Sequence, residues 1–553
     1  MVDLGRLFSR FRGVGRRGKK RPVKLGLEEA ALPQQERLEA IRASAGFASL
    51  TRAGFKPVKV YPLEEPWSRA VILQNPETGE TLYWVDEIPL NEAEREVYNK
   101  IMDALYWEME PPKSGVDPYE HFREEAKRVI QRYMLRFGET ISPLISWRKI
   151  QYYVIRDTVG YGKIDPIMKD ENIEDISCDG VGKPIYVWHR EYESIPTNIV
   201  FETEDELDNM VVKLAHKAGK HVSVAFPIVD AILPGGHRLA ATFKREVSMK
   251  GSTFTIRKFR EKPLSVIDLI RGGTLSPELA AYFWLAMEFK NTGLILGVTG
   301  AGKTTLLNVL ASMLKPTTKV VTIEDTPELK LTLDNWVQLV ARPSYGIGPE
   351  KVGEITLFDL VKVSLRYRPD VIIVGEVRGE EAYVLFQAIA TGHGGLTTLH
   401  AETIDAAVKR LTSPPMNIPE SYIPLMNFAA VIKRVRLYNP DGTYKIARRV
   451  TEVWEIRDYN DYPVIARWNP ATRRHEVNFG QSIVLRSIAE QVGADYTWVA
   501  EEIEKRSTIL KWLAVEGITD YRKVYKVVSE YYASPSRVYE RARDALRSAE
   551  AFG

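Results

Sequence analysis

Hydrophobic and polar positions along this chain change their period several times, and each change predicts an element. Short continuous apolar runs alternate with helical patterns in the middle of the chain. The runs cover residues 293–298, 320–323, 371–374 and 396–399. Apolar strands separated by helices are typical of a parallel sheet covered on both faces. We therefore predict an α/β domain in which the polar residues that follow these strands meet at one sheet edge.

Upstream of this region the pattern predicts smaller mixed elements. Residues 71–73 and 81–85 flank a Pro-Glu-Thr-Gly turn and read as a hairpin. Asn91 and Glu94 have the spacing of a capping box at the start of a helix. The residues expected on the buried face of this helix are Val97, Ile101, Leu105 and Trp107.

Between residues 116 and 258 a long helix is expected at 118–137 and a second one at 204–218. Strands are expected at 185–188, 199–201, 238–243 and 253–259. No glycine-rich entry into a helix follows Gly160 and Gly162, so these glycines read as a turn.

Downstream of the sheet, residues 445–480 predict a hairpin appended to it, and the rest predict helices. Candidate core residues of these last helices are Ile503, Leu510, Leu513, Val524, Val528 and Tyr531. The predicted parts of the chain are a basic tail (1–25), a small interaction domain (26–115), a second mixed domain (116–261), a hinge (262–264), the parallel-sheet domain (265–480) and a helical region (481–553).

The stretch 297–305 fits the phosphate-binding pattern G-x-x-x-x-G-K-[ST] between a predicted strand and a predicted helix. Glycines let backbone N–H groups surround phosphate oxygens, and the new helix directs its positive end at them. Lys303 can reach the β- and γ-phosphates, and Thr304 can bind Mg²⁺. The residues predicted to hold the nucleotide are Gly297, Thr299, Gly300, Ala301, Gly302, Lys303, Thr304 and Thr305.

Charged residues follow the next three apolar runs. Glu324 and Glu328 come after the second run and can orient a water molecule or take its proton. Glu376 and Arg378 come after the third run, where Glu376 would hold Mg²⁺ through water, and His400 after the fourth could sense the γ-phosphate. Each has a structural alternative, namely a surface turn for the acidic stretch and a surface ion pair for Arg378; for His393 we favour a structural role.

Composition narrows the function classes. The chain has 553 residues, a net charge of +3 and one cysteine, which excludes an intramolecular disulfide framework and a multi-cysteine zinc site. No apolar run approaches the roughly 18 residues of a membrane-spanning helix, and no signal peptide is visible, so we expect a cytoplasmic protein. Residues 1–25 are either a solubilising tail or an arm that contacts acidic lipid or an acidic partner.

The order of these motifs resembles the type II/type IV secretion ATPase superfamily. The matching stretches are 297–304, 322–328, 368–378 and 391–400, which look like its Walker A, Asp box, Walker B and His box. Residues 160–185 and 235–259 look like its amino-terminal domain, and the archaeal branch, which holds archaellum motors and archaeal type IV pilus assembly ATPases, is most similar. The resemblance implies a RecA-like core, a smaller PAS-like α/β domain before it, and an extra amino-terminal region.

The resemblance also implies a mechanism. Members are cytoplasmic homohexamers that hydrolyse ATP with Mg²⁺ and act at the cytoplasmic face of the membrane on a platform protein. Arginines of their amino-terminal domain close over the nucleotide, and Arg238 and Arg257 match these positions, with Arg260 a weaker third. Many bacterial members carry a four-cysteine zinc site; the single Cys178 here argues against that branch.

Other functions stay open at this point. A nucleic-acid-translocating motor built on the same sheet is the main alternative, although the near-neutral charge leads us to expect no nucleic acid. A scaffold that binds ATP without hydrolysing it and a small-molecule kinase are less favoured. The sequence does not separate archaellum, adhesive pilus and secretion machines, or extension from retraction.

Overall fold

The computed structural model describes residues 54–108, 110, 118–137, 144–260, 262–342, 353–438 and 444–552. The basic tail and the first part of the predicted interaction domain therefore lie outside the described residues. Contacts divide the chain into two compact units. The first is Met1–Asp170, Cys178–Val187 and Ile195–Met210, and the second is Glu171–Ser177, Trp188–Ser194 and Val211–Gly553.

The described part of the first unit starts with an antiparallel meander. Its strands are β1 (Lys56–Glu64), β2 (Ser68–Gln74) and β3 (Thr81–Glu87). β2 and β3 pair across the predicted turn, with Val71 opposite Trp84, which confirms the hairpin. β3 then runs parallel to β6 (Glu193–Val200) through Tyr83 and Thr197, and β5 (Pro184–His189) follows in the order β1-β2-β3-β6-β5.

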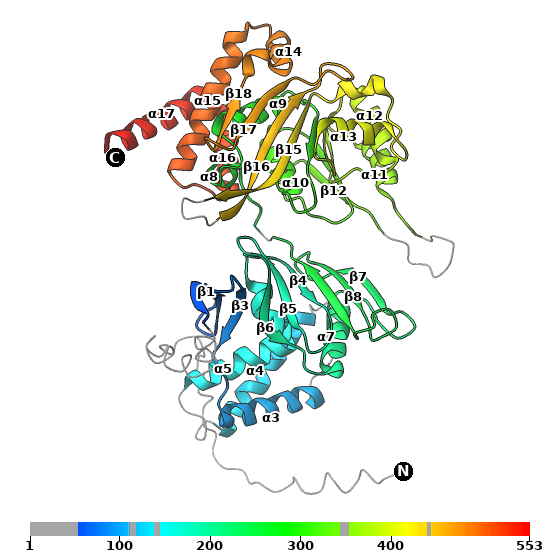
Figure 1. The fold of residues 1–553 in the computed structure, drawn as a ribbon, viewed down its shortest axis with the longest axis vertical. Helices are drawn as coiled ribbons and strands as arrows, with labels where there is room; N and C mark the ends of the chain where they lie inside the picture. The colour runs from blue at the N-terminus through cyan, green and yellow to red at the C-terminus, as the bar shows by residue number, and fades with distance from the viewer. Residues whose placement is uncertain are drawn as a thin grey trace, which may run out of the picture. The chain divides into compact units, whose positions relative to one another are not determined.

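Three helices form a second layer of this unit (Figure 1). They are α3 (Glu92–Glu108), α4 (Pro118–Phe137) and α5 (Leu144–Thr158), and they share a core that includes Val97, Ile101, Ala126, Val129 and Trp147. The predicted capping box is confirmed, because Asn91 N–H donates to Glu94 Oε2 at 2.8 Å and Glu94 N–H donates to Asn91 Oδ1 at 2.9 Å. The prediction for Trp107 is wrong: its side chain is 82% exposed at the end of α3.

The second unit includes β4 (Ile173–Cys178), which follows the short helical segments η3 (Gly162–Ile164) and α6 (Asp165–Lys169). Its first strands have the order β4-β9-β8-β7 in the sheet, with β7 at Ile228–Ile232, β8 at Arg238–Thr242 and β9 at Thr253–Arg257. β8 pairs antiparallel with both β7 and β9, so the last two predicted strands are confirmed. The predicted helix at 204–218 is α7 (Glu204–Lys217), and the turn at Gly160 is confirmed by the break after α5.

A nine-stranded sheet of described residues organises the rest of this unit, in the order β12-β11-β13-β14-β10-β15-β16-β17-β18 (Figure 1). Its parallel part is β10 (Gly293–Leu296), β11 (Val320–Glu324), β12 (Trp336–Val340), β13 (Val371–Val374), β14 (Gly394–Leu399) and β15 (Phe428–Tyr438). Pairing of β10 with β14 and β15, and of β13 with β11 and β14, is parallel throughout, which confirms the predicted parallel sheet.

Two strands of the sheet were not predicted. β12 extends it beyond β11, and β15 lies directly beside the phosphate-loop strand. The antiparallel strands predicted within residues 445–480 are confirmed: β16 (Tyr444–Glu455) pairs antiparallel with β15, followed by β17 (Val464–Asn469) and β18 (Arg474–Val477).

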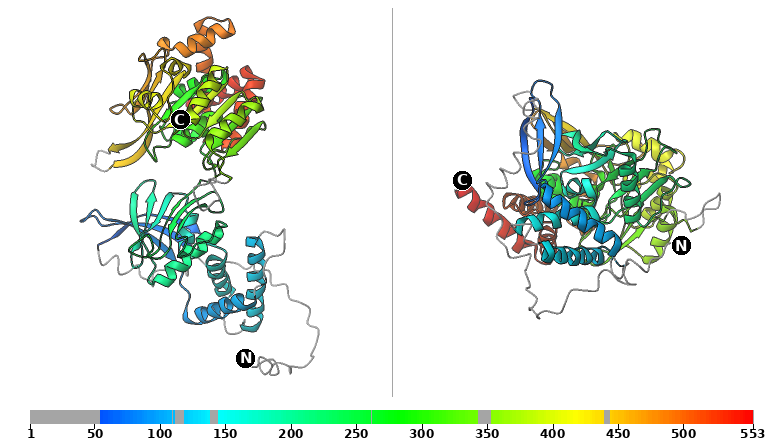
Figure 2. Two further views of the ribbon diagram at one scale, coloured as in Figure 1. Left: turned by 90° about the vertical axis from the view of Figure 1, so that its right-hand side faces the viewer. Right: turned by 90° about the horizontal axis from the view of Figure 1, so that it is seen from below.

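Helices cover both faces of this sheet (Figure 2). Successive strand residues point to opposite sides, so a continuous apolar run gives the sheet two apolar faces to bury. Ile295, Ile373 and Ile432 face a core shared with α9 (Pro277–Glu288) and α10 (Lys303–Ala311). Leu294, Ile372 and Val431 face the other core, with α11 (Leu357–Ser364), α12 (Glu381–Ala390) and α13 (Ile404–Thr412). Residues on both faces are buried, as the continuous apolar runs require.

The carboxy-terminal helices pack on the first of these cores together with the short α8 (Val266–Arg271), which was not predicted. They are α14 (Ile483–Val492), α15 (Tyr496–Val515), α16 (Tyr521–Ala533) and α17 (Pro535–Phe552). All six predicted core residues of this region, from Ile503 to Tyr531, are buried.

Candidate nucleotide-binding site

The predicted phosphate loop joins β10 to α10 at the carboxyl edge of the parallel strands. Gly300 and Gly302 have φ values of +72° and +103°, which residues with a Cβ rarely adopt. Gly302 is the residue before the first turn of α10, so the free N–H groups of that turn open onto the loop. The glycines and the helix start therefore have the geometry of the anion cradle that the spacing predicted.

Four side chains from three of the predicted motifs meet beside this loop, and we call them the phosphate-edge cluster: Lys303, His400, Glu376 and Arg378. Lys303 Nζ donates to Val298 O at 3.1 Å and lies 3.2 Å from His400 Nδ1. His400 Nε2 lies 2.9 Å from Glu376 Oε1, and Arg378 Nη2 donates to Glu376 Oε2 at 2.8 Å. The structure thus brings together residues separated by up to 97 positions along the chain.

The cluster assigns the proton on His400. Lys303 can only donate, so its partner His400 Nδ1 must be an acceptor, and the imidazole hydrogen lies on Nε2. That hydrogen is on the side of Glu376. Although His400 Nε2 lies 2.9 Å away, Glu376 Oε1 is a buried oxygen with no hydrogen-bond partner among the described residues. One oxygen of this carboxylate thus keeps acceptor capacity.

Electrostatics keep His400 neutral and Glu376 ionised. Burial and the charge of Lys303 lower the pKa of His400 below its ordinary value of 6.5. Burial alone would raise the pKa of Glu376, but its hydrogen bond with Arg378 and the nearby positive charges outweigh burial and hold the pKa below 4.5. Burial also lowers the pKa of Lys303 from 10.5. The cluster therefore presents an ammonium, a neutral imidazole and a carboxylate at neutral pH.

The acidic stretch after β11 divides into two kinds of carboxylate. Glu324 is buried and saturated: its Oε1 accepts from the backbone N–H groups of Glu328 and Leu329, both at 2.8 Å. Its Oε2 accepts from Gln338 Nε2 at 2.9 Å. Burial raises the pKa of Glu324; these hydrogen bonds lower the pKa, but burial outweighs them. Glu324 therefore fixes the loop, and Glu328 is the exposed carboxylate that the loop presents.

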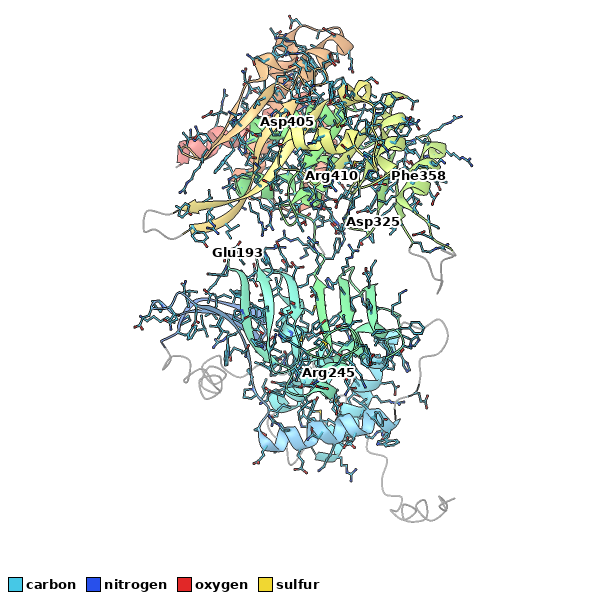
Figure 3. All side chains as sticks on the ribbon, turned by 45° about the vertical axis from the view of Figure 1, so that its right-hand side comes forward. Glu193, Arg245, Asp325, Phe358, Asp405 and Arg410 are labelled. Atoms are coloured by element: carbon cyan, nitrogen blue, oxygen red, sulfur yellow. The ribbon has the colours of Figure 1, made fainter. Side chains whose placement is uncertain are left out.

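Asp325 lies next to Arg378, with 3.9 Å between Oδ2 and Nη1, and is labelled in Figure 3. This contact links the stretch after β11 to the stretch after β13. His393, in contrast, lies outside the cluster: its Nδ1 is 3.0 Å from Ala388 O and 3.1 Å from Thr391 Oγ1 at the end of α12. The structural role favoured for His393 agrees with these contacts.

Arg238 and Arg257 are opposite each other on β8 and β9, and both side chains are exposed. Arg238 Nε lies 4.0 Å from Asp230 Oδ1, the limit of an ion pair. The two predicted arginines thus form one pair on one face of their sheet. Their approach to a nucleotide stays a prediction.

Several residues that support the site were not singled out from the sequence. Gln338 comes from β12, Asn308 Oδ1 accepts from Lys330 N–H at 2.8 Å, and Arg410 Nη1 donates to His400 O at 2.9 Å. Arg410 lies on α13 (Figure 3). Arg448 of β16 donates to Gly300 O of the phosphate loop at 3.3 Å. These residues belong to none of the recognised motifs. Their contribution depends on which element lies beside the loop, and the sequence does not reveal that.

The residues beside the loop fit a Mg²⁺ ion that is held partly by protein side chains and partly by the phosphates of a bound nucleotide. Among the described residues no group of three or more His, Cys, Asp or Glu side chains could hold a metal ion alone. Mg²⁺ usually keeps several waters and is bound through one or two carboxylates together with substrate phosphates. The half-buried hydroxyl-bearing Thr304 at the start of α10 and the open oxygen of Glu376 are donors of that kind.

Comparisons with known proteins agree with this geometry. The family described as type II/IV secretion system protein matches residues 162–435. The uncharacterized protein MJ0900 of Methanocaldococcus jannaschii is 36% identical over 507 residues, which cover 86% of this chain and 89% of that protein. The chain belongs to the type II/IV secretion ATPase superfamily. The long match to an archaeal protein favours the archaeal branch of this superfamily.

Other proteins are similar over parts of the chain. The type IV secretion system protein PtlH homolog of Bordetella bronchiseptica is 29% identical over 280 residues, covering 46% of this chain and 81% of that one. Among solved structures, the Legionella pneumophila ATPase DotB is 18% identical, with 65% of this chain and 91% of that chain covered at a TM-score of 0.39. The pilus retraction motor PilT with bound ADP is 19% identical, with coverage of 61% and 88% and a TM-score of 0.36.

Proposed function

We propose that this secretion-superfamily protein is a Mg²⁺-dependent ATPase that works as a homohexamer. ATP hydrolysis would drive the assembly of type IV pilus-like filaments or secretion, through a membrane platform protein at the cytoplasmic face. The single observation that carries the proposal is the phosphate-edge cluster, because it connects the phosphate loop through His400 to Glu376. An anion cradle alone would bind nucleotide; the attached imidazole and carboxylate supply groups that can respond to the terminal phosphate.

We assign a role to each residue of the proposed site. The loop amides and Lys303 bind the β- and γ-phosphates, and Thr304 and Glu376 hold the shell of Mg²⁺, which supplies charge neutralisation when bound. Glu328 positions the attacking water, and Glu324 is a positioning residue because its carboxylate is occupied by the loop that carries Glu328.

Arg378 and His400 would report the state of the γ-phosphate. Lys303 is bonded to His400 Nδ1, so a phosphate that draws Lys303 away would free that nitrogen. Glu376 holds Arg378, and Arg378 also reaches Asp325, so the change can spread to the loop after β11. Arg238 and Arg257 would add positive charge to the transferred phosphoryl group when the hinge at 262–264 closes.

Contact with the membrane would come through a surface or a partner. Among the helices of the described residues, none is both long and apolar enough to span a bilayer. The basic tail, residues 1–25, would contact acidic lipid, and the platform protein would receive the motion.

The test is ATP turnover by the full chain with Mg²⁺. We expect measurable hydrolysis by the wild type and at least a hundredfold loss in Lys303→Ala, because the loop then lacks its phosphate-binding cation. Lys315→Ala is a matched control, since Lys315 is an exposed lysine just after the same helix. Equal turnover by wild type and Lys303→Ala would refute the proposal. Sedimentation with and without ATP tests the hexamer.

Stimulation separates the proposed machine from its main alternative. Vesicles containing acidic lipid should increase turnover, and deletion of residues 1–25 should remove that increase. DNA or RNA should have no effect. Stimulation by nucleic acid and not by acidic vesicles would instead favour a nucleic-acid motor.

A further inference from the structure

Strands β15 and β16 carry a pair of arginines directly opposite each other. Arg434 is the register partner of Arg448, two positions beyond the buried pair Ile432 and Val450. Side chains alternate along a strand, so the arginines share the face of Ile432 and Val450. Like charges directly opposite in an antiparallel pair are destabilising, which calls for an anion to offset them.

The arginine pair borders the phosphate loop. Arg448 Nη2 and Nε lie 3.3 and 3.4 Å from Gly300 O. A Cβ on Gly302 would lie 3.1 Å from Arg448 Cδ, and one on Gly300 would lie 4.0 Å from Arg434 Cζ. The glycine at 302 therefore leaves room for the Arg448 side chain, whereas a Cβ on Gly300 would only reach ordinary van der Waals contact with Arg434.

The pair keeps a net positive charge. Arg448 Nη2 also forms an ion pair with Glu174 Oε1 at 2.9 Å, but Arg190 shares this carboxylate at 3.4 Å, so Glu174 offsets at most one of the two charges. No carboxylate of the described residues forms an ion pair with Arg434, which is half-buried. Exposed cations in water need no partner, but a half-buried guanidinium beside another one is a site where an anion is stabilised.

The order of the strands tells which part of a nucleotide would lie there. Glu376 follows β13 and His400 follows β14, both on one side of β10, whereas β15 and β16 lie on the other side. A terminal phosphate that faces Glu376 and His400 leaves the rest of the nucleotide to extend across the loop toward β15. Arg434 and Arg448 are therefore on the side of the α-phosphate.

We propose that Arg434 and Arg448 form an α-phosphate subsite that binds ATP and ADP alike. The inference rests on the proposed nucleotide function but does not depend on hydrolysis. It gives the β15–β16 hairpin a part in holding the nucleotide, opposite the residues that respond to its terminal phosphate.

The test measures the affinity of the full chain for Mg²⁺-ADP and for Mg²⁺ with a non-hydrolysable β,γ-methylene ATP, by competition against a fluorescent ADP. Arg434→Ala and Arg448→Ala should each weaken both ligands at least fivefold, and to a similar extent. Lys433→Ala removes the same charge one residue away on the opposite face of β15, and it should stay within twofold of the wild type. Unfolding midpoints check that the variants fold, and Arg434→Gln replaces Arg434→Ala if that variant does not.

The outcomes distinguish the subsite from two different roles of these arginines. If Arg448→Ala weakens binding while Arg434 variants bind as the wild type, Arg448 only supports the loop through Gly300, and the subsite is refuted. A loss confined to the triphosphate analogue would place the arginines at the terminal phosphate and also refute it. A wild type that binds ADP but does not hydrolyse ATP would overturn the proposed function and leave the subsite standing.

Discussion

Two charged clusters in the second unit use the same kinds of residue in opposite ways. The phosphate-edge cluster combines Lys303, His400, Glu376 and Arg378 at a sheet edge, and its Arg378 side chain is 56% exposed. The rear cluster combines Arg506, Glu502, Glu288 and Tyr531 between α9, α15 and α16, and its Arg506 side chain is 3% exposed.

The surroundings differ as much as the exposure. Arg506 is bonded to Glu288 and lies 3.3 Å from Glu502, with its guanidinium 5.0 Å from the Trp284 ring and 5.2 Å from the Tyr531 ring. Tyr531 donates to Glu502 at 2.7 Å. Aromatic rings and helices enclose these charges, whereas the phosphate-edge cluster has a mostly exposed Arg378 and lies beside the glycine-containing phosphate loop. Charge density alone therefore does not identify a site; access does.

The largest effect is expected when a substitution disrupts the rear cluster. Arg506→Met should lower the free energy of unfolding by about 3 kcal/mol, because the half-buried Glu288 would lose its cation and the buried Glu502 would keep only Lys505, at 3.2 Å. Turnover per folded molecule should not change. Urea titration and ATPase assays measure the two quantities. Lys511→Met, which breaks the exposed pair with Glu278, is the control and should change stability by less than about 1 kcal/mol. A stable Arg506→Met with reduced turnover would contradict the comparison.

The next largest effect is expected when the phosphate-edge cluster is disrupted. Glu376→Gln should reduce turnover by about a hundredfold or more, since the amide lacks the negative charge that faces His400 and the metal shell. The free energy of unfolding should stay within about 1 kcal/mol of the wild type, since the residue lies at an edge. Glu380→Gln makes the same change at an exposed position four residues later. A large loss of stability in Glu376→Gln would mean that both clusters are structural.

A smaller effect concerns pH. Arg378→Ala should move the acidic limb of turnover to higher pH, with about tenfold lower turnover at neutral pH. Without Arg378, its hydrogen bond and its charge no longer lower the pKa of Glu376, so that pKa rises; the pKa of His400 also rises, because a nearby cation is lost. Activity that needs ionised Glu376 and neutral His400 is present above these pKa values and falls as pH drops through them. Arg366→Ala, at an exposed site, should leave the limb in place. An unchanged profile in Arg378→Ala would separate Arg378 from this titration.

The smallest effect is expected from removing a single hydrogen bond in the rear cluster. Tyr531→Phe removes one hydroxyl that donates to Glu502, so we expect a loss of about 1 kcal/mol in the free energy of unfolding. Turnover and nucleotide affinity should equal those of the wild type. Urea titration resolves the difference, and any change in turnover would show that the two clusters are coupled.

Much of the architecture could be predicted because its signals are local. The apolar runs of β10, β11, β13 and β14 are buried on both faces, so their composition reveals them without any partner. The glycine and lysine spacing of the phosphate loop likewise depends on nearby backbone conformation. The meeting of Glu376 and His400 followed from the rule that parallel strands end at one edge, and the structure confirms their contact.

Other features were decided by packing between distant parts of the chain. β12 and the charged half of β15 lack a continuous apolar run, because one is an edge strand and the other leaves the core midway. Trp107 is a different case: it follows the buried Leu105 by two residues, which turns its side chain to the other side of α3, so local periodicity already disfavours a buried position there. The saturation of Glu324 and the approach of Arg448 to Gly300 depend on which strand lies beside the loop.

The residue pattern alone was therefore enough for the parallel sheet, the phosphate cradle and the carboxyl edge where chemistry gathers, because each is written in residues close together in the chain. Which carboxylate keeps an open oxygen, and which arginines face the cradle, became visible only in three dimensions. Those properties depend on hydrogen-bond partners and burial contributed by segments far away in the sequence, and no local spacing encodes them.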